Sequence, residues 1–419
     1  MSNSGEMRFR CVRCGATYSV DQDLFGCPRC QSAVPAALHL EYPHPPLTSA
    51  LVQEWERRPP GVWRYAEALP VDPASAVSIG EGGTPLVSIP KLGAKLGLPR
   101  LLVKNEAQNP TWSFKDRLAS VAVSWAAVNG RRGIGVSSSG NAGAAAAAYA
   151  AHAGMPCVIF TTRSFPGTMQ RFMRAYGAMV VATPTAPDRW MLNRAVAHEW
   201  DWLPVSNVAD PPVGSHASGI AGHKTIAFEI AQDLGWQAPD AVILPVAYGD
   251  AMAGVYAGFA ELMSGGVTDR LPRLIAAEAY PSLSAALSAG HEAPMYTEGT
   301  GSQAFSVATS RSTYQALRAI RATGGTSVAV PDETTLRWHR ELREGEGLFV
   351  EFSSAMPLAA AERLCADGVL DGDDQVVALL TSSGLKDPEI TLGAEELPSV
   401  QPDLEDLERV LKAVYGFRR

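Results

Sequence analysis

The sequence predicts an α/β fold built on parallel β-sheets. From about residue 100 onward, short apolar runs alternate with segments of helical periodicity, which is the pattern of parallel α/β sheets. The last expected strand is Gln375–Leu380. Its run Val376–Leu380 is apolar throughout, as expected for a parallel strand buried on both faces. The other expected strands are Leu101–Lys104, Gly133–Ser137, Cys157–Thr161, Met179–Ala182, Ala241–Val246, Arg273–Ala277 and Ser327–Val330, with helices such as Arg117–Val128, Thr168–Tyr176, Thr225–Leu234 and Thr334–Leu342 between them.

Residues 1–40 contain two cysteine pairs, Cys11 with Cys14 and Cys27 with Cys30, and each pair is separated by two residues. Paired knuckles of this kind in a chain that shows no secretory signal predict a tetrahedral zinc site rather than disulfides. Four thiolates leave no open coordination position, so the zinc is expected to be structural. A segment this small has little core, and a metal worth on the order of 10 kcal/mol would supply its folding energy. Reduced, metal-free thiols are the alternative.

The composition is that of an ordinary globular enzyme of 419 residues, long enough for two or three domains. The net charge of -8 argues against a surface that binds nucleic acid overall. The longest weakly apolar run, Ala142–Ala151, is too short and too weakly hydrophobic to span a bilayer. We therefore expect a cytoplasmic protein with no membrane or nucleic-acid partner. Near the C-terminus, residues 402–414 predict an amphipathic helix whose apolar stripe packs in the core or against a second copy.

Lys115 is the most informative residue, because three loops of complementary chemistry accompany it. It lies in the run Asn109–Arg117. Elsewhere, a strand ends in a Ser-Gly-Asn turn at residues 138–141 and enters an Ala-rich helix. A second strand feeds the small-residue loop 247–254, and the last strand runs into the hydroxyls of Thr381 and Ser382. An amine, an amide loop, an anion-binding loop and a hydroxyl pair are what an aldehyde cofactor with a phosphate group needs.

These segments, in this order, resemble the fold-type II pyridoxal 5'-phosphate (PLP) enzymes, and the threonine synthases most closely. The resemblance includes Glu81–Leu86, Lys224–Ile230 and Gly347–Ala355, and it covers nearly the whole chain. It implies two open parallel-sheet α/β domains behind the zinc ribbon. Residues 41–106 and 225–419 would form a large domain that binds the PLP phosphate, and residues 107–224 a small domain with the Ser-Gly-Asn loop. A homodimer is expected.

The resemblance also implies roles for individual residues. Lys115 would form a Schiff base with the cofactor and then move the substrate α-proton. Asn141 would donate to the cofactor's phenolic oxygen, and a neutral hydroxyl, of Thr381 rather than Ser382, would face the ring nitrogen. The residues expected to bind the cofactor are Lys115, Asn141, Ala247, Tyr248, Gly249, Asp250, Ala251, Met252, Thr381 and Ser382, and those expected to contact the amino-acid substrate are Trp112, Ser138, Ser139, Gly140 and Ala142.

Two features of these loops carry specific expectations. Gly140 is expected to adopt a backbone conformation forbidden to other residues. Asp250 beside a phosphate is electrostatically odd, so it should point away or cap the following helix.

The chain departs from the threonine synthase pattern at several positions that bear on substrate choice. Gly219 stands where the family usually has an arginine for the substrate phosphate, and Ala142 stands where a hydroxyl is usual. Trp112 replaces the glycine before Ser-Phe-Lys, and it is expected to narrow the pocket. The departures predict weaker binding of O-phosphohomoserine. The residues that could replace the arginine are His216, Lys224 and Arg311.

Three functions are compatible with these observations. The first is a PLP-dependent lyase that performs elimination and replacement, with O-phosphohomoserine and water giving threonine and phosphate as the default reaction. The second is a β-replacement or deaminating PLP enzyme acting on serine, threonine, or a phosphorylated or acylated analogue. The third is a non-catalytic protein whose zinc ribbon binds a partner, and the presence of Lys115, Asn141 and Thr381 argues against it.

Overall fold

The computed structural model describes residues 7–22, 24–163, 167–299, 301–388, 398–400 and 402–417. The strands are β1 (Arg8–Cys11), β2 (Thr17–Ser19), β3 (Leu38–Glu41), β4 (Leu86–Ser88), β5 (Leu101–Asn105), β6 (Gly133–Ser137), β7 (Cys157–Thr162), β8 (Met179–Thr183), β9 (Trp202–Pro204), β10 (Ala241–Pro245), β11 (Arg273–Glu278), β12 (Thr326–Ala329) and β13 (Val376–Leu380). The α-helices are α1 (Ser49–Glu56), α2 (Pro90–Leu96), α3 (Lys115–Val128), α4 (Asn141–His152), α5 (Gly167–Ala175), α6 (Ala186–Trp200), α7 (Ala217–Gly222), α8 (Lys224–Asp233), α9 (Asp250–Ser264), α10 (Ser282–Ser288), α11 (Tyr314–Ala322), α12 (Asp332–Gly345), α13 (Met356–Ala366) and α15 (Leu404–Tyr415). Short 3₁₀ turns cover Val62–Ala68, Pro73–Ser75, Glu106–Gln108, Phe352–Ala355 and Gly384–Lys386.

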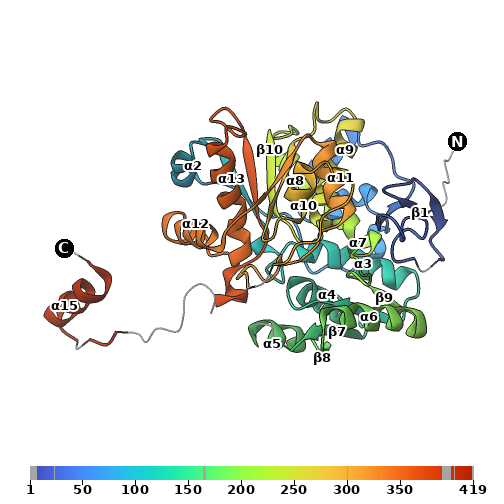
Figure 1. Cartoon of the computed structure of the whole chain (residues 1–419), viewed down its shortest axis with the longest axis horizontal. Helices are drawn as coiled ribbons and strands as arrows, with labels where there is room; N and C mark the ends of the chain where they lie inside the picture. Colours follow the sequence, from blue (N-terminus) through green and yellow to red (C-terminus); the bar gives the residue numbers. More distant parts are fainter. Residues whose placement is uncertain are drawn as a thin grey trace.

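The strands of the described residues form three sheets (Figure 1). A six-stranded sheet has the order β12-β11-β10-β13-β5-β4 and is parallel except for β4, which pairs antiparallel with β5. A four-stranded sheet, β8-β7-β6-β9, is parallel throughout. The N-terminal segment forms a small antiparallel sheet of order β2-β1-β3. The predicted α/β class is confirmed, and each strand expected from the sequence is present to within two residues. The domain limits expected from the sequence stay a prediction.

Helices cover both faces of the six-stranded sheet. Successive side chains of each strand point to opposite faces, so they pack against different helices. In β10, Val242 and Leu244 pack with residues of α8, α9 and α11. Ala241 and Ile243 pack instead with residues of α2, α12 and α13. Every residue of β10 and β13 is buried, which explains why both strands read as unbroken apolar runs.

The four-stranded sheet is sandwiched in the same way. Ile134 and Val136 of β6 pack with side chains of α3 and α4, whose Ala-rich sequence allows a close approach to the sheet. On the other face, Val158 and Phe160 of β7 pack with Val196 of α6. The helices α3 and α4 therefore lie between this sheet and the rest of the chain, as Figure 1 shows.

The N-terminal sheet shares a hydrophobic cluster with the main body. Phe9 and Leu38 are buried together with Leu118 and Trp125 of α3 and with Ala217 of α7. Sequence analysis expected a segment with almost no core of its own, and the structure shows where the missing burial comes from. The short strands of this segment, like β4 and β9, were not predicted, because three or four residues are too few for a clear periodicity.

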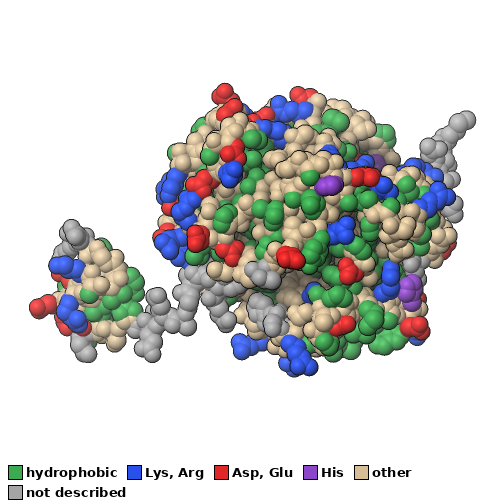
Figure 2. Space-filling view, in the orientation of Figure 1, with side chains coloured by type: hydrophobic (Ala, Val, Ile, Leu, Met, Phe, Trp, Pro, Cys, Tyr) green, Lys and Arg blue, Asp and Glu red, His purple; other side chains and the backbone are tan. Residues whose placement is uncertain are grey.

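Helix α15 confirms the predicted C-terminal helix, but the expectation that its stripe packs into the core of the same chain is wrong. Of its described residues only Val410 is buried, while Leu404 is 72% exposed and Val414 is 56% exposed. Figure 1 shows α15 apart from the main body, and Figure 2 shows its apolar side chains gathered on one side. Packing against a second copy stays a prediction. No helix within the described residues is long and apolar enough to cross a membrane.

A buried charge network fixes the start of α3. The guanidinium of Arg117 is fully buried and donates to both carboxylate oxygens of Glu106, at 2.7 and 2.8 Å, and to both of Glu229, at 2.6 and 2.7 Å. Burial alone would lower the pKa of Arg117, but the charges of the two glutamates raise it well above its usual value. Lys104 joins the network through Glu229 at 2.9 Å and the carbonyl of Thr84 at 2.6 Å.

The network connects segments that are distant in sequence. Glu106 follows β5, Glu229 lies in α8, and Gly83 and Thr84 donate their backbone amides to Glu229 at 2.8 and 3.2 Å. Two sequence segments that carry the family resemblance, 81–86 and 224–230, thus meet at one guanidinium. Because Arg117 stands two residues after Lys115, the same bonds set the position of that lysine's backbone.

We predict that Arg117→Met lowers the free energy of unfolding by about 3–5 kcal/mol, because it leaves two buried carboxylates without their partner. Urea unfolding followed by circular dichroism measures the change. The matched control is Arg363→Met, which removes an exposed pair with Asp367 and should cost at most about 1 kcal/mol. Equal losses in the two variants would contradict a special role for the buried network.

Candidate active site

The loops singled out by the sequence meet around one cavity of about 470 Å³. They follow the carboxyl ends of β5, β6, β10 and β13, where ligands bind in open α/β sheets. Thirteen of the fifteen residues expected to bind cofactor or substrate line this cavity, all except Trp112 and Ser382. The lining residues are Phe114, Lys115, Ser137–Ala142, Thr162, Ala186, Arg189, Trp190, Ser206, Asn207, Ser215, Pro245–Met252, Phe305–Thr309 and Thr381.

Lys115 is the first residue of α3 and lies in the cavity wall. Burial lowers the pKa of its ammonium group, and the charge of Asp250 opposes that shift. Its Nζ lies 4.6 Å from the ring centroid of Phe114, whose backbone amide donates to the carbonyl of Thr381 at 3.0 Å. The lysine is therefore held next to the end of β13, and its amine is easier to deprotonate than a lysine in water.

The Ser-Gly-Asn loop leads from β6 into α4. Gly140 precedes the helix, and the free amides of the first turn of α4 can bind an anion. Ser138 Oγ accepts from the Gly140 amide at 3.1 Å, and Ser139 Oγ lies 2.8 Å from Thr161 Oγ1. Gly140 has a φ of −147° and a ψ of −141°, which is outside the left-handed region, and the expectation that its backbone conformation excludes other residues stays a prediction.

The side chain of Asn141 is held on both sides by buried groups. Its Nδ2 donates to Glu351 Oε2 at 2.6 Å, while its Oδ1 accepts from Lys386 Nζ at 2.7 Å and from Ser382 Oγ at 3.2 Å. Burial lowers the pKa of Lys386 to about 8, with Asp116, Glu351 and Asp387 opposing. Glu351 stands in the segment 347–355 that carries the resemblance, and Lys386 follows Thr381 and Ser382, but sequence reasoning gave neither residue a role. The contacts assign both to the positioning of Asn141.

The loop after β10 forms the second helix start in the cavity wall. Gly249 has a φ of +76°, and a Cβ there would stand 2.3 Å from Cβ of Ala316, so only glycine fits. The carbonyls of Ala247 and Tyr248 accept from Ser312 Oγ at 2.6 Å and Thr313 Oγ1 at 2.5 Å. Because these two carbonyls are hydrogen-bonded to Ser312 and Thr313, the free backbone amides in the first turn of α9 can serve as an anion-binding site.

Asp250 is turned into a network of its own. It accepts from Ser215 Oγ at 2.6 Å and from Gln315 Nε2 at 2.7 Å. No side chain caps α9. The sequence allowed two alternatives, that Asp250 points away from the phosphate or that it caps the following helix. The hydrogen bonds to Ser215 and Gln315 agree with the first alternative, and α9 shows no side-chain cap.

Thr381 and Ser382 take different positions. Thr381 lines the cavity, and its Oγ1 lies 2.9 Å from Ser354 Oγ. Ser382 is fully buried outside the lining and donates to the carbonyl of Trp112 at 3.0 Å. The sequence-based preference for Thr381 agrees with this arrangement.

Trp112 does not belong to the cavity lining. It is 41% exposed, and its indole stacks on the ring of Phe172 with centroids 5.2 Å apart. Its φ of +62° explains why glycine is usual at this position. The expectation that the indole narrows the substrate pocket has no support in this lining.

Among the residues that could replace the missing arginine, none lines the cavity. Gly219 itself packs against Leu118 and Ala122. Lys224 is bound by Tyr42 and Glu261, and Arg311 donates to the carbonyl of Pro294. The ring of His216 packs against Phe9 and Trp125.

An arginine that the sequence analysis did not single out, Arg189 of α6, does line the cavity. It lies in a part of α6 that belongs to none of the motifs described above, so the sequence carried no signal for it.

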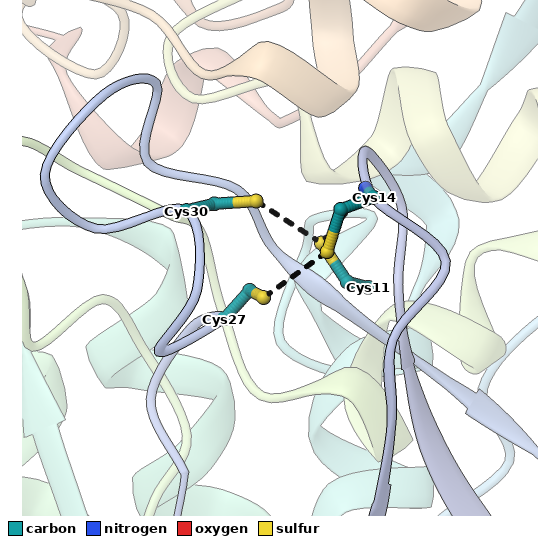
Figure 3. Close-up of side chains that lie close together, drawn as sticks. All are labelled: Cys11, Cys14, Cys27 and Cys30. Carbon is teal, nitrogen blue, oxygen red and sulfur yellow. Dashed lines mark hydrogen bonds between the residues drawn. The ribbon is translucent and has the colours of Figure 1, made fainter.

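The four N-terminal cysteines meet at a separate site (Figure 3). Their sulfur atoms all lie within 4.8 Å of one another, and both Cys11–Cys30 and Cys14–Cys27 are 3.7 Å apart. A disulfide would require about 2.05 Å. A tetrahedron with zinc–sulfur bonds of about 2.3 Å has edges of about 3.8 Å, so the arrangement fits a Cys₄ zinc site.

Comparison with known proteins agrees with this site. The family model described as "Pyridoxal-phosphate dependent enzyme" matches residues 77–382. The threonine synthase of Methanocaldococcus jannaschii is 34% identical over 96% of this chain and 99% of its own length. The threonine synthase of Methanosarcina acetivorans is 33% identical over 97% of this chain and 98% of its own. The chain therefore belongs to the pyridoxal-phosphate-dependent enzymes and is a homologue of the threonine synthases.

Among solved structures, threonine deaminase isoform 2 from Solanum lycopersicum superimposes with a TM-score of 0.61. The match covers 80% of this chain and 84% of the deaminase at 20% identity. At that identity the likeness establishes the shared fold-type II architecture.

Proposed function

We propose that this enzyme catalyses elimination and replacement on an amino acid that carries a leaving group. The default reaction converts O-phosphohomoserine and water into threonine and phosphate. The observation that carries the proposal is the meeting of Lys115, two helix starts and the Thr381 hydroxyl around one cavity. Similarity to threonine synthases over nearly the full length supports the same reaction class.

The cavity residues fit PLP. The Lys115 amine would hold the cofactor, and the amides at the start of α9 would hold its phosphate. Thr381 would place a neutral hydroxyl at the ring nitrogen, which favours elimination and replacement over transamination. Asn141 has one N–H engaged by Glu351, so its second N–H is left for the cofactor's phenolic oxygen. When bound, PLP supplies an aldehyde for the substrate amine and a ring that withdraws electrons from the substrate's α-carbon.

The protein's own groups then do three things. The amides at the start of α4 hold the substrate carboxylate, helped by Ser138 and Ser139. Burial lowers the pKa of Lys115. After the substrate amine has displaced the lysine from the cofactor, its free amine takes the proton from the substrate's α-carbon and returns it to a carbon of the substrate side chain. Asn141 is kept in one orientation by Glu351 and Lys386, so it needs no reorganisation during the reaction.

A β-replacement or deaminating enzyme acting on serine, threonine or an analogue is the second candidate. Ala142 favours it, because this position lines the cavity without the hydroxyl that the threonine synthase pattern places there. We expect O-phosphohomoserine to give phosphate and threonine in equal amounts, and serine and threonine to give little keto acid. Phosphate release and keto-acid formation, measured across O-phosphohomoserine, O-phosphoserine, serine and threonine, separate the candidates. Keto acid as the main product would replace the first proposal with the second.

Lys115→Ala is expected to abolish turnover and to leave the fold intact, because no other amine of the described residues lines the cavity wall at this position. Borohydride reduction of the wild type, followed by peptide mapping, should place the cofactor's mass on Lys115. Lys95→Ala, at an exposed lysine paired with Glu341, is the control and should keep both activity and label. A label on another lysine would refute the assignment.

We also propose that the four cysteines hold one structural zinc ion. The fit of the sulfur spacing supports this, and four thiolates would leave the metal no open position for catalysis. The sulfur cluster adjoins the hydrophobic cluster shared with α3, so the metal would hold the N-terminal sheet against the main body.

Metal analysis should give about one zinc per chain, and Cys27→Ser should lose it. Chelation is expected to increase hydrogen exchange across residues 1–40 without releasing PLP, because the metal would add to the folding energy that this segment gains from the shared hydrophobic cluster. Cys365→Ser, at a cysteine outside the cluster, should keep the zinc. Loss of the PLP absorbance on chelation would show that the two sites depend on each other.

A further inference from the structure

Arg189 is built into the wall of the cavity rather than the protein surface. It lies in the first turn of α6, and its carbonyl accepts from Ser137 Oγ at 2.9 Å, which ties the helix to the end of β6. Its Nη1 donates to Ser139 Oγ at 3.1 Å. The guanidinium therefore lies beside the loop that would hold the substrate carboxylate.

The guanidinium lacks an anionic partner. Its Nε is buried without a hydrogen-bond partner, and none of the ion pairs formed among the described residues involves Arg189. Burial lowers the pKa of Arg189, and the nearby Tyr248 phenol opposes that shift. A partly buried cation with a buried Nε that no group accepts from is costly, and an anionic ligand would offset that cost.

The other charged side chains of the cavity lining already have a partner or a proposed role. Among the described residues, the lining contains three charged ones, Lys115, Asp250 and Arg189. Lys115 would hold the cofactor, and Asp250 is bound by Ser215 and Gln315. Of the cations that the structure describes in this wall, Arg189 is thus the one that remains for a substrate.

We propose that Arg189 binds a second negative charge of the substrate, the phosphoryl oxygens of its leaving group. The inference rests on the proposed function and narrows its substrate class to amino acids phosphorylated on the side-chain hydroxyl. A guanidinium presents two parallel N–H donors that match two oxygens of a phosphate. Arg189 would thereby supply the phosphate contact that is absent at Gly219, from a different element of the fold.

The test compares ligands that differ only in side-chain charge. Steady-state kinetics use O-phosphoserine against O-acetylserine, and O-phosphohomoserine against O-acetylhomoserine. Calorimetry on the PLP-loaded enzyme uses the phosphonate in which CH₂ replaces the bridging oxygen of O-phosphohomoserine, because this ligand cannot lose phosphate. Arg189→Gln removes the charge, and Arg189→Lys keeps the charge without the fork.

Arg189→Gln should lower kcat/KM for the phosphorylated substrates about 10- to 100-fold and leave the acetylated ones within about twofold. The dissociation constant of the phosphonate should rise by the same factor, with a smaller rise for Arg189→Lys. The matched control is Arg194→Gln, on the same helix. Arg194 also has a buried Nε without a partner, but it lies outside the cavity lining and over the Phe25 ring. It should change neither constant.

Equal losses for charged and neutral ligands would overturn the proposal and place Arg189 on the substrate carboxylate. No loss for any ligand would overturn it as well. If the wild type binds the phosphonate through Arg189 but turns over none of the amino acids, the proposed function fails and the assignment of Arg189 stands. A wild type that does not bind the phosphonate at all refutes the assignment of Arg189.

Discussion

The architecture of this enzyme depends on one buried guanidinium. Arg117 connects the turn before β4, the segment after β5 and helix α8, and it does so with two bidentate carboxylate contacts in a site without solvent. A single charged group can satisfy this many partners only if all of them are fixed at once. The start of α3 is therefore specified by contacts from segments that precede it and follow it in the sequence. Lys115, the lysine proposed to hold the cofactor, lies two residues before Arg117, so the same contacts fix the position of its backbone.

Sequence patterns were sufficient where a residue's environment repeats along the chain. The strand Val376–Leu380 could be predicted because burial on both faces demands apolar residues at every position. Gly249 and the Ser-Gly-Asn turn could be placed because each lies between a strand and a helix. Thr381 could be preferred over Ser382 by its position in the string, and the cavity lining agrees.

Other features could not be predicted because they depend on contacts between distant segments. Nothing local marks Arg189, whose importance comes from Ser139 fifty residues earlier. The same holds for Lys386, which reaches Asn141 across 245 positions. Trp112 was expected in the pocket because Phe114 and Lys115, close to it in sequence, line the site. Its own indole stacks instead on Phe172 of α5.

The hydrophobic cluster shared by the N-terminal sheet and α3 has a consequence for the protein's life in the cell. Phe9 and Leu38 belong to the same buried hydrophobic cluster as Leu118 and Trp125, so detachment of this sheet would expose apolar side chains of the main body. Such surfaces promote aggregation and recognition by chaperones. The zinc ion proposed at the cysteine cluster would then keep these side chains covered, even though the cluster contributes no residue to the cavity.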